Sequence, residues 1–111
     1  MKIEKRKKGD VVILDIKGKI LLGDGIDELR ETINGVIQNN ETKLLLNFAD
    51  VPYLDSTGLG EVVRSYTSLR KEGGMVKIVN LTNKVQDLLS VTKLITVFET
   101  FEDEEKAVES F

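Results

Sequence analysis

The sequence predicts an α/β domain in which a mixed β-sheet is packed with about four helices. Residues 2–22 are rich in β-branched residues and turn residues, whereas the chain after residue 43 alternates apolar strand-like runs with helical periodicity. Strands joined by helix-length connections pair in parallel. We therefore expect a parallel centre with an antiparallel N-terminal edge. A length of 111 residues fits one domain spanning residues 1–111.

The first strands follow from turn residues that separate apolar runs. Residues 11–16 form a β-branched apolar run, and Gly9-Asp10 before them is turn chemistry. Residues 2–8 are therefore expected to pair with this run as an exposed first strand. A second turn at Gly18-Lys19 predicts a short third strand over Ile20–Leu22.

Two helical stretches enclose a leucine-rich strand. The first stretch, opened by Asp24 as the expected N-cap, places its apolar residues on one face: Ile26, Leu29, Ile33, Val36 and Ile37. Residues 43–48 are mostly apolar, which is typical of a central strand covered on both faces. The second helical stretch covers residues 59–69 and is expected to end at Gly73-Gly74.

The C-terminal third continues the alternation. Met75–Val79 is the next expected strand, followed by a helix that Thr82 or Asn83 caps. Ile95–Phe98 predicts a last short strand. A closing helix then places Ala107, Val108 and Phe111 on its apolar side.

Composition excludes several classes of function. The 41% apolar and 32% charged residues fit a globular domain and argue against disorder. The chain has no Cys and no His, so it can form neither disulfides nor Ser-His-Asp or Cys-His nucleophile systems, and ordinary zinc sites lose their preferred ligands. No cofactor or metal site is expected. No membrane-spanning run and no secretion signal is present, which predicts a cytoplasmic protein.

The first eight residues contain five basic side chains, while the net charge of the chain is −3. Such a cluster suits either contact with nucleic acid or lipid, or the protection of an exposed edge strand by lysines. We favour the edge-strand interpretation and expect no direct nucleic acid partner and no membrane partner. The sequence does not indicate an oligomeric state.

The segment between the leucine-rich strand and the second helix is the most informative part of the chain. In open α/β sheets, functional sites gather at the carboxyl ends of strands. Asp55, Ser56 and Thr57 are all N-cap residue types, and Gly58 and Gly60 are poor helix residues that let another surface approach the backbone. Two interpretations stay open from the residues alone: Ser56 or Thr57 only caps the helix, or the segment is a docking site.

The run Asp55-Ser56-Thr57-Gly58-Leu59-Gly60 resembles the Asp-Ser-(Ser/Ala/Thr)-Gly-Leu-Gly signature of the STAS domain family, found in anti-sigma factor antagonists. The resemblance covers nearly the whole chain, from the β-rich opening to the helix around residues 85–89. One difference is Gly23-Asp24-Gly25, where many antagonists carry a Leu-Asp pair. This difference bears on the partner more than on the fold.

The resemblance implies a non-enzymatic switch in which Ser56 is phosphorylated, with Thr57 a weaker second candidate. The unmodified antagonist would bind an anti-sigma factor that is itself a serine kinase, which frees the sigma factor. Phosphorylation would end the binding, and a serine phosphatase would reset the protein. The expected docking surface comprises Asp24, Gly25, Asp55, Ser56, Thr57, Gly58, Leu59 and Gly60. Glu61, one turn on, is expected to add negative charge beside the phosphate.

Other functions fit the sequence less well. Within the same family, a stressosome-like scaffold or a subunit of a lipid-transport complex would not depend on phosphorylation; the intact Asp55-Ser56 pair favours the antagonist. A hydrolase or phosphotransferase would need acids that converge on a pocket, whereas the obvious acids lie on solvated helix faces. An aspartyl-phosphate receiver would need an acidic pair where Asp15 stands alone. P-loop and dinucleotide fingerprints are incomplete.

Overall fold

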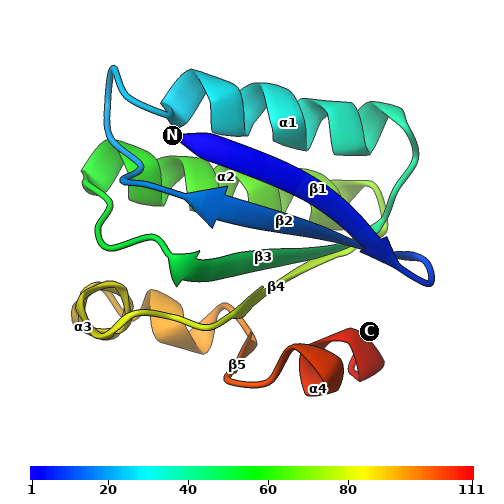
Figure 1. Ribbon diagram of the computed structural model, residues 1–111. Coiled ribbons are helices and arrows are strands. Elements are labelled where there is room, and N and C mark those ends of the chain that lie inside the picture. The colour runs from blue at the N-terminus through cyan, green and yellow to red at the C-terminus, as the bar shows by residue number, and fades with distance from the viewer.

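The computed structural model describes all residues, 1–111. It has one five-stranded sheet with the order β1-β2-β3-β4-β5, in which β1 and β2 pair antiparallel and all other neighbours pair parallel (Figure 1). The strands are β1 Lys2–Lys8, β2 Val11–Lys17, β3 Lys43–Asp50, β4 Met75–Val79 and β5 Thr100–Phe101. The helices are α1 Ile26–Gln38, α2 Ser56–Lys71, α3 Asn83–Val91 and α4 Glu104–Glu109, with a short 3₁₀ helix at Leu94–Thr96. The predicted fold class is confirmed.

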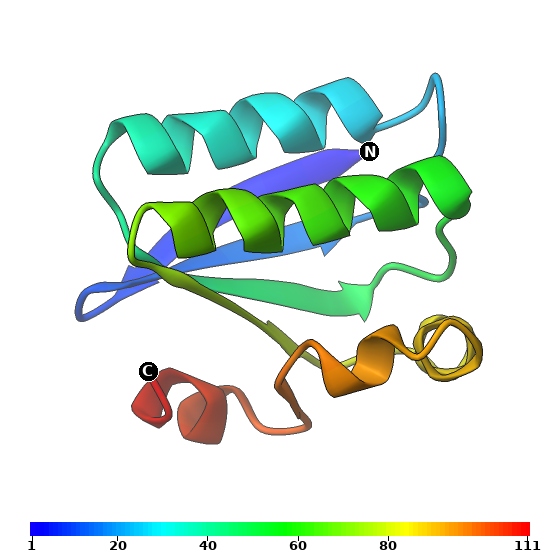
Figure 2. The same cartoon turned by 180° about the vertical axis from the view of Figure 1, so that it is seen from behind.

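The helices cover the sheet unequally. The two long helices, α1 and α2, lie side by side on one face, and the short α4 lies on the other (Figures 1 and 2). The helix α3 follows β4 at the carboxyl end of that strand. Since α1 and α2 both begin at the carboxyl end of the parallel strands, the loops that lead into them share one end of the molecule (Figure 1).

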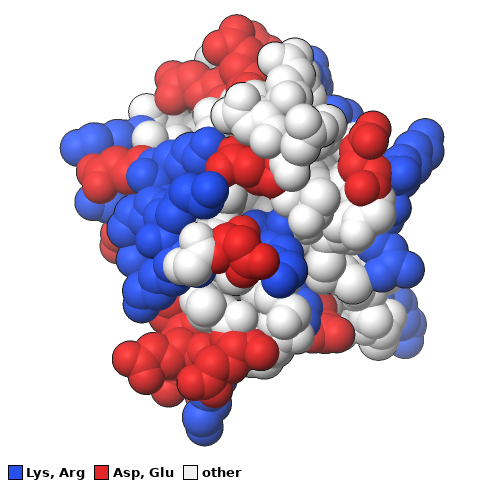
Figure 3. All heavy atoms as spheres, turned by 90° about the vertical axis from the view of Figure 1, so that its right-hand side faces the viewer, with Lys and Arg blue, Asp and Glu red and all other residues white.

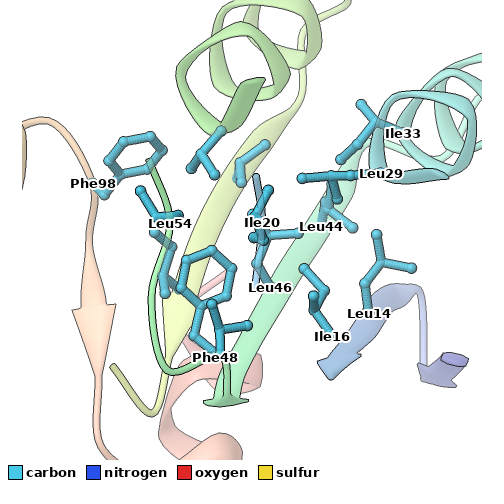
Figure 4. Close-up of a cluster of buried hydrophobic side chains, with 14 of the residues drawn as sticks. Leu14, Ile16, Ile20, Leu29, Ile33, Leu44, Leu46, Phe48, Leu54 and Phe98 are labelled. Atoms are coloured by element: carbon cyan, nitrogen blue, oxygen red, sulfur yellow. The ribbon is translucent and has the colours of Figure 1, made fainter. Parts of the chain in front are cut away.

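The core follows the alternation of side chains along the central strands. Leu14, Leu44 and Leu46 point toward α1 and α2 and pack with residues such as Leu29 and Ile33 of α1 (Figure 4). A smaller cluster on the opposite face joins Val11, Ile13, Leu45 and Val79 to Ala107 of α4. Burial on both faces explains why β2 and β3 are mostly apolar in sequence, with only Asp15 and Asn47 between their apolar residues.

Three local predictions are wrong. Ile20–Leu22 is not a strand; Ile20 makes a single bridge to Leu54 and the chain then turns back. Ile95–Phe98 is not a strand either, because the chain forms a 3₁₀ turn at Leu94–Thr96 that delivers Phe98 to the core, and the last strand follows at β5. The N-cap of α1 is Gly25 in a left-handed conformation, not Asp24, and no side chain caps this helix.

The basic N-terminal residues lie on an edge strand, as the favoured interpretation predicted. Lys5 donates to Glu41 at 2.6 Å, and the Arg6 guanidinium bonds both Asp15 and Glu104. Basic and acidic side chains are intermingled on the side of the molecule that Figure 3 shows. No helix is both long enough and apolar enough to span a membrane. The edge of β1 is thus occupied by charged, largely paired side chains, which disfavours pairing with another strand.

Candidate functional site

Ser56 is the first residue of α2 and is exposed, as is Thr57 beside it. The segment that leads to it leaves β3 and is anchored by two buried apolar residues, Val51 and Leu54. Anchoring of this kind holds the backbone of the loop against the core while the hydroxyl groups that follow remain accessible. The structure therefore presents Ser56 on a fixed surface at the carboxyl end of the sheet.

Asp55 provides the side-chain cap of α2. Its Oδ1 accepts a hydrogen bond from the backbone N–H of Gly58 at 2.8 Å, and its Oδ2 accepts one from the backbone N–H of Leu22 at 3.0 Å. These backbone donors, first Leu22 and then Gly58, hold the pKa of the Asp55 carboxyl below its ordinary value. Capping by Asp55 contradicts the interpretation in which Ser56 or Thr57 only caps the helix.

The bond to Leu22 belongs to a ladder that joins two loops. The Ile20 N–H donates to the Tyr53 carbonyl at 3.2 Å, and the Asp55 N–H donates to the Ile20 carbonyl at 3.3 Å. Gly18 is held in the same way by the Asp50 carbonyl at 2.9 Å. The loop that contains Asp24 and Gly25 is consequently fixed against the loop that precedes Ser56, and the side chain of Asp24 is exposed.

The two glycines of the motif have different surroundings. A Cβ at Gly58 would overlap the carbonyl oxygen of Ile20 and lie 3.1 Å from its Cγ2, so this glycine is needed for the two loops to meet. A Cβ at Gly60 would meet nothing within 4 Å. Leu59 between them is buried in the core. Gly60 is thus the glycine whose missing side chain leaves room for an approaching surface.

Glu61 does not add net charge beside Ser56, contrary to expectation. Its side chain is 1% exposed and lies between α1 and α2, where Arg30 donates to Oε1 at 2.9 Å and Arg64 to Oε2 at 2.7 Å. Arg64 also reaches the side-chain oxygen of Asn34 on α1. Two cations therefore surround one buried carboxylate, and Asp55 is the unpaired anion nearest to Ser56 in the sequence.

Sequence reasoning missed two exposed apolar side chains at this site. Leu22 is 72% exposed although the fully buried Ile20 lies two residues before it, and Tyr53 is 43% exposed although it directly precedes the buried Leu54. The available signal was weak: Leu22 ends an apolar triplet that predicts a strand, and Tyr53 follows the only proline of the chain.

Comparison with known proteins places this geometry in a family. The family model described as STAS domain matches residues 2–107. A Bacillus subtilis protein named anti-sigma-B factor antagonist is 42% identical over 45 residues, which cover 40% of this chain and 41% of that relative. The match therefore spans less than half the length of the relative.

Solved structures agree on the fold. A candidate anti-sigma factor antagonist from Thermotoga maritima superimposes with a TM-score of 0.90 at 24% identity, covering 97% of this chain and 92% of that one. The anti-sigma factor antagonist SpoIIAA of Bacillus, at 18% identity, gives TM-scores of 0.73 for its unphosphorylated form and 0.77 for its phosphorylated form, over 98% of this chain and 92% and 98% of those chains. Because the family model matches nearly the whole chain, this protein belongs to the STAS domain family.

Proposed function

We propose that this protein is an anti-sigma factor antagonist controlled by phosphorylation of Ser56. The unphosphorylated form binds an anti-sigma factor that is also a serine kinase, and the phosphorylated form does not; a serine phosphatase restores the first form. The observation that carries the proposal is the exposed Ser56 at the start of α2, left out of the helix cap because Asp55 provides it. The names of the relatives support the same class of partner.

A phosphate at this position is compatible with the fold. Phosphorylation adds roughly −1.5 to −2 charge at pH 7, and the N-terminus of a helix favours an anion by ~0.3–1 kcal/mol. The apolar stripe of α2 that packs on the sheet includes Leu59, Val62 and Leu69, all remote from solvent. Modification therefore changes the surface and leaves the packing of α2 intact.

The same phosphate opposes docking. It stands beside the Asp55 carboxylate, which stays ionised because backbone donors hold its pKa low. A partner that covers Ser56 must desolvate both anions. The repulsion that counts is the one formed on docking: for an effective dielectric constant of ~20, each unit of negative charge that the partner brings within ~6 Å of the phosphate costs on the order of 3 kcal/mol. That corresponds to about a hundredfold in affinity, so local electrostatics alone provides a binding switch.

The test is a binding titration against each anti-sigma factor serine kinase encoded in the source genome, in the presence of a nucleotide that cannot transfer phosphate. We expect Ser56→Ala to bind like the unmodified protein and Ser56→Asp to bind about a hundredfold more weakly. Ser90→Asp, which places the same charge on an exposed position of α3, is the matched control and should bind normally. Equal affinities for Ser56→Ala and Ser56→Asp would refute the switch.

A phosphotransfer assay separates this function from that of a scaffold. With the cognate kinase and ATP, phosphate should be incorporated at residue 56 of the unmodified chain and not of Ser56→Ala. Incorporation at Thr57 instead would move the switch by one residue. Binding without any incorporation would favour the scaffold or transport-subunit alternative within the STAS family.

A further inference from the structure

The largest cavity of the protein, of about 600 Å³, lies where β3, β4 and β5 end and α3 begins. None of its lining residues belongs to the segment 55–60 that contains Ser56. Small-molecule sites have volumes of ~300–1,000 Å³ and gather at the carboxyl ends of strands in open α/β sheets. The cavity therefore has the size and the place of a ligand site that the proposed function does not use.

Polar side chains in the lining have atoms without a partner in the protein. Asn80 donates its amide group to Asn47 Oδ1 at 3.2 Å, while its own Oδ1 accepts no hydrogen bond. The backbone of Asn80 is held in place, since its N–H donates to the Phe101 carbonyl at 2.9 Å. The side chains of Gln86, Thr100 and Glu102 form no hydrogen bond within the protein. The cavity thus offers a carboxylate and a fixed amide oxygen as acceptors, together with two groups that can donate or accept.

Glu102 is the only charged residue in the lining. Every Lys and Arg in the five strands lies within 3.8 Å of a carboxylate, so none of them is free to balance it. The adjoining helices α3 and α4 carry two unpaired basic residues, Lys84 and Lys106, and neither lines the cavity. The residues of α3 whose N–H groups lack a helical partner, 83–85, do not line it either.

The acids of these two helices outnumber the two lysines. Asp87 of α3, Asp103 at the N-cap of α4, and Glu105 and Glu109 of α4 form no ion pair, and all four are exposed. The surroundings therefore leave the charge of Glu102 uncompensated. A phosphate or carboxylate group would meet repulsion in this cavity, whereas a cation would meet a counter-charge.

We propose that this cavity binds a small planar organic cation of the guanidinium or amidinium class. Such a group holds several N–H donors in one plane and has no acceptor, which matches the acceptors of Glu102 and Asn80. Paired N–H donors also suit a carboxylate, which can accept two parallel hydrogen bonds. The flat apolar part of the ligand packs against Leu81 and Phe101, which belong to the apolar part of the lining. This ligand site is separate from the switch at Ser56 and does not depend on it.

The test uses three ring compounds of nearly the same shape and different charge: benzamidine, a cation; benzamide, which is neutral; and benzoate, an anion. Each is titrated into the isotope-labelled protein while the backbone amide resonances are followed by NMR. Benzamidine should shift the amides of Gln86, Thr100 and Glu102 in a saturable manner. Benzamide should bind about tenfold more weakly, because charge-assisted hydrogen bonds are the stronger ones. Benzoate should not shift these amides.

Variants assign the binding to the carboxylate. Glu102→Gln keeps the size of the exposed side chain and removes its charge, so it should weaken benzamidine binding about tenfold while the remaining spectrum stays that of the folded protein. Glu105→Gln makes the same change at an exposed residue outside the cavity and should bind benzamidine normally. Ser56→Asp should also bind it normally, because Ser56 does not line the cavity.

Each contrary result overturns a defined part of the inference. Equal affinities for benzamidine and benzoate would overturn the charge class of the ligand, and unchanged binding by Glu102→Gln would overturn the role of the carboxylate. Benzamidine shifts that miss the lining residues, or no shifts at all, would overturn the site. Weaker binding by Ser56→Asp would place the ligand at the Ser56 surface instead. None of these results bears on the phosphorylation switch, which the kinase titrations test independently.

Discussion

Replacing Gly58 by alanine tests how the site is built. The new Cβ would overlap the carbonyl oxygen of Ile20 and lie 3.1 Å from the carbonyl carbon and the Cγ2 of that residue, inside the ~3.5–4.0 Å contact distance of non-bonded heavy atoms. Because Ile20 is fully buried and its carbonyl accepts from the Asp55 N–H, the obstacle is backbone that cannot rotate away. Either α2 or the loop before α1 must move.

The expected free-energy change combines three contributions, of which two destabilise the fold and one stabilises it. Overpacking of a well-packed site costs about 1–3 kcal/mol, while alanine in place of glycine in a helix is favourable by up to ~1 kcal/mol. Displacement of the loop also weakens the Leu22–Asp55 hydrogen bond, which is worth about 1 kcal/mol. We therefore expect Gly58→Ala to lower the free energy of unfolding by about 1–3 kcal/mol.

Gly60→Ala is the matched control, since a Cβ at this position meets nothing within 4 Å. It makes the same chemical change two residues along the same helix and should raise the free energy of unfolding by up to ~1 kcal/mol. Urea denaturation, followed by far-ultraviolet circular dichroism, gives both values. Equal stability of the two variants would show that close contact with Ile20 is not the reason for Gly58.

Two further predictions concern charged groups. Glu61→Ala should lower the free energy of unfolding by about 1–3 kcal/mol, because it leaves Arg30 and Arg64 without their carboxylate. The control Glu28→Ala, on the exposed face of α1, should change it by less than ~0.5 kcal/mol. Equal stability of the two variants in urea denaturation would contradict this prediction. The folded-state pKa of Asp55 lies below its unfolded value of about 3.9, so its contribution to stability is complete at neutral pH and is lost as pH falls through the folded pKa. The urea midpoint of Asp55→Asn should therefore fall less between pH 7 and pH 3 than that of the unmodified protein, and an identical fall would rule out this role of the carboxylate.

The elements that sequence periodicity predicted well are those whose burial pattern is local. The apolar face of α1 is buried as expected, and the mostly apolar β3 has helices on both sides. The strand predicted at Ile20–Leu22 failed for a reason that the residues do not display. Ile20 pairs with Leu54, more than thirty positions away, for only one bridge before the turn at Gly23 reverses the chain.

The residues of the site show the same contrast between features that depend on sequence neighbours and features that depend on distant contacts. The sequence indicated the loop that leads into α2 and the hydroxyl residues at its end, Ser56 and Thr57, both of which are exposed. It did not separate the roles of Gly58 and Gly60, since the difference depends on the Ile20 carbonyl. The neutralisation of Glu61 likewise depends on Arg30, which α1 places beside α2.

By itself, then, the sequence determined the α/β class, the order of most elements and the position of Ser56 at the start of a helix, because side-chain periodicity and turn chemistry act between neighbours in the chain. Only the tertiary structure decided that Asp55, which caps this helix through the nearby Gly58, also holds the Leu22 turn, and that Leu22 is exposed beside it. The physical reason is that the Leu22–Asp55 hydrogen bond joins loops more than thirty residues apart, and the packing of α1 against α2 on the sheet brings those loops together.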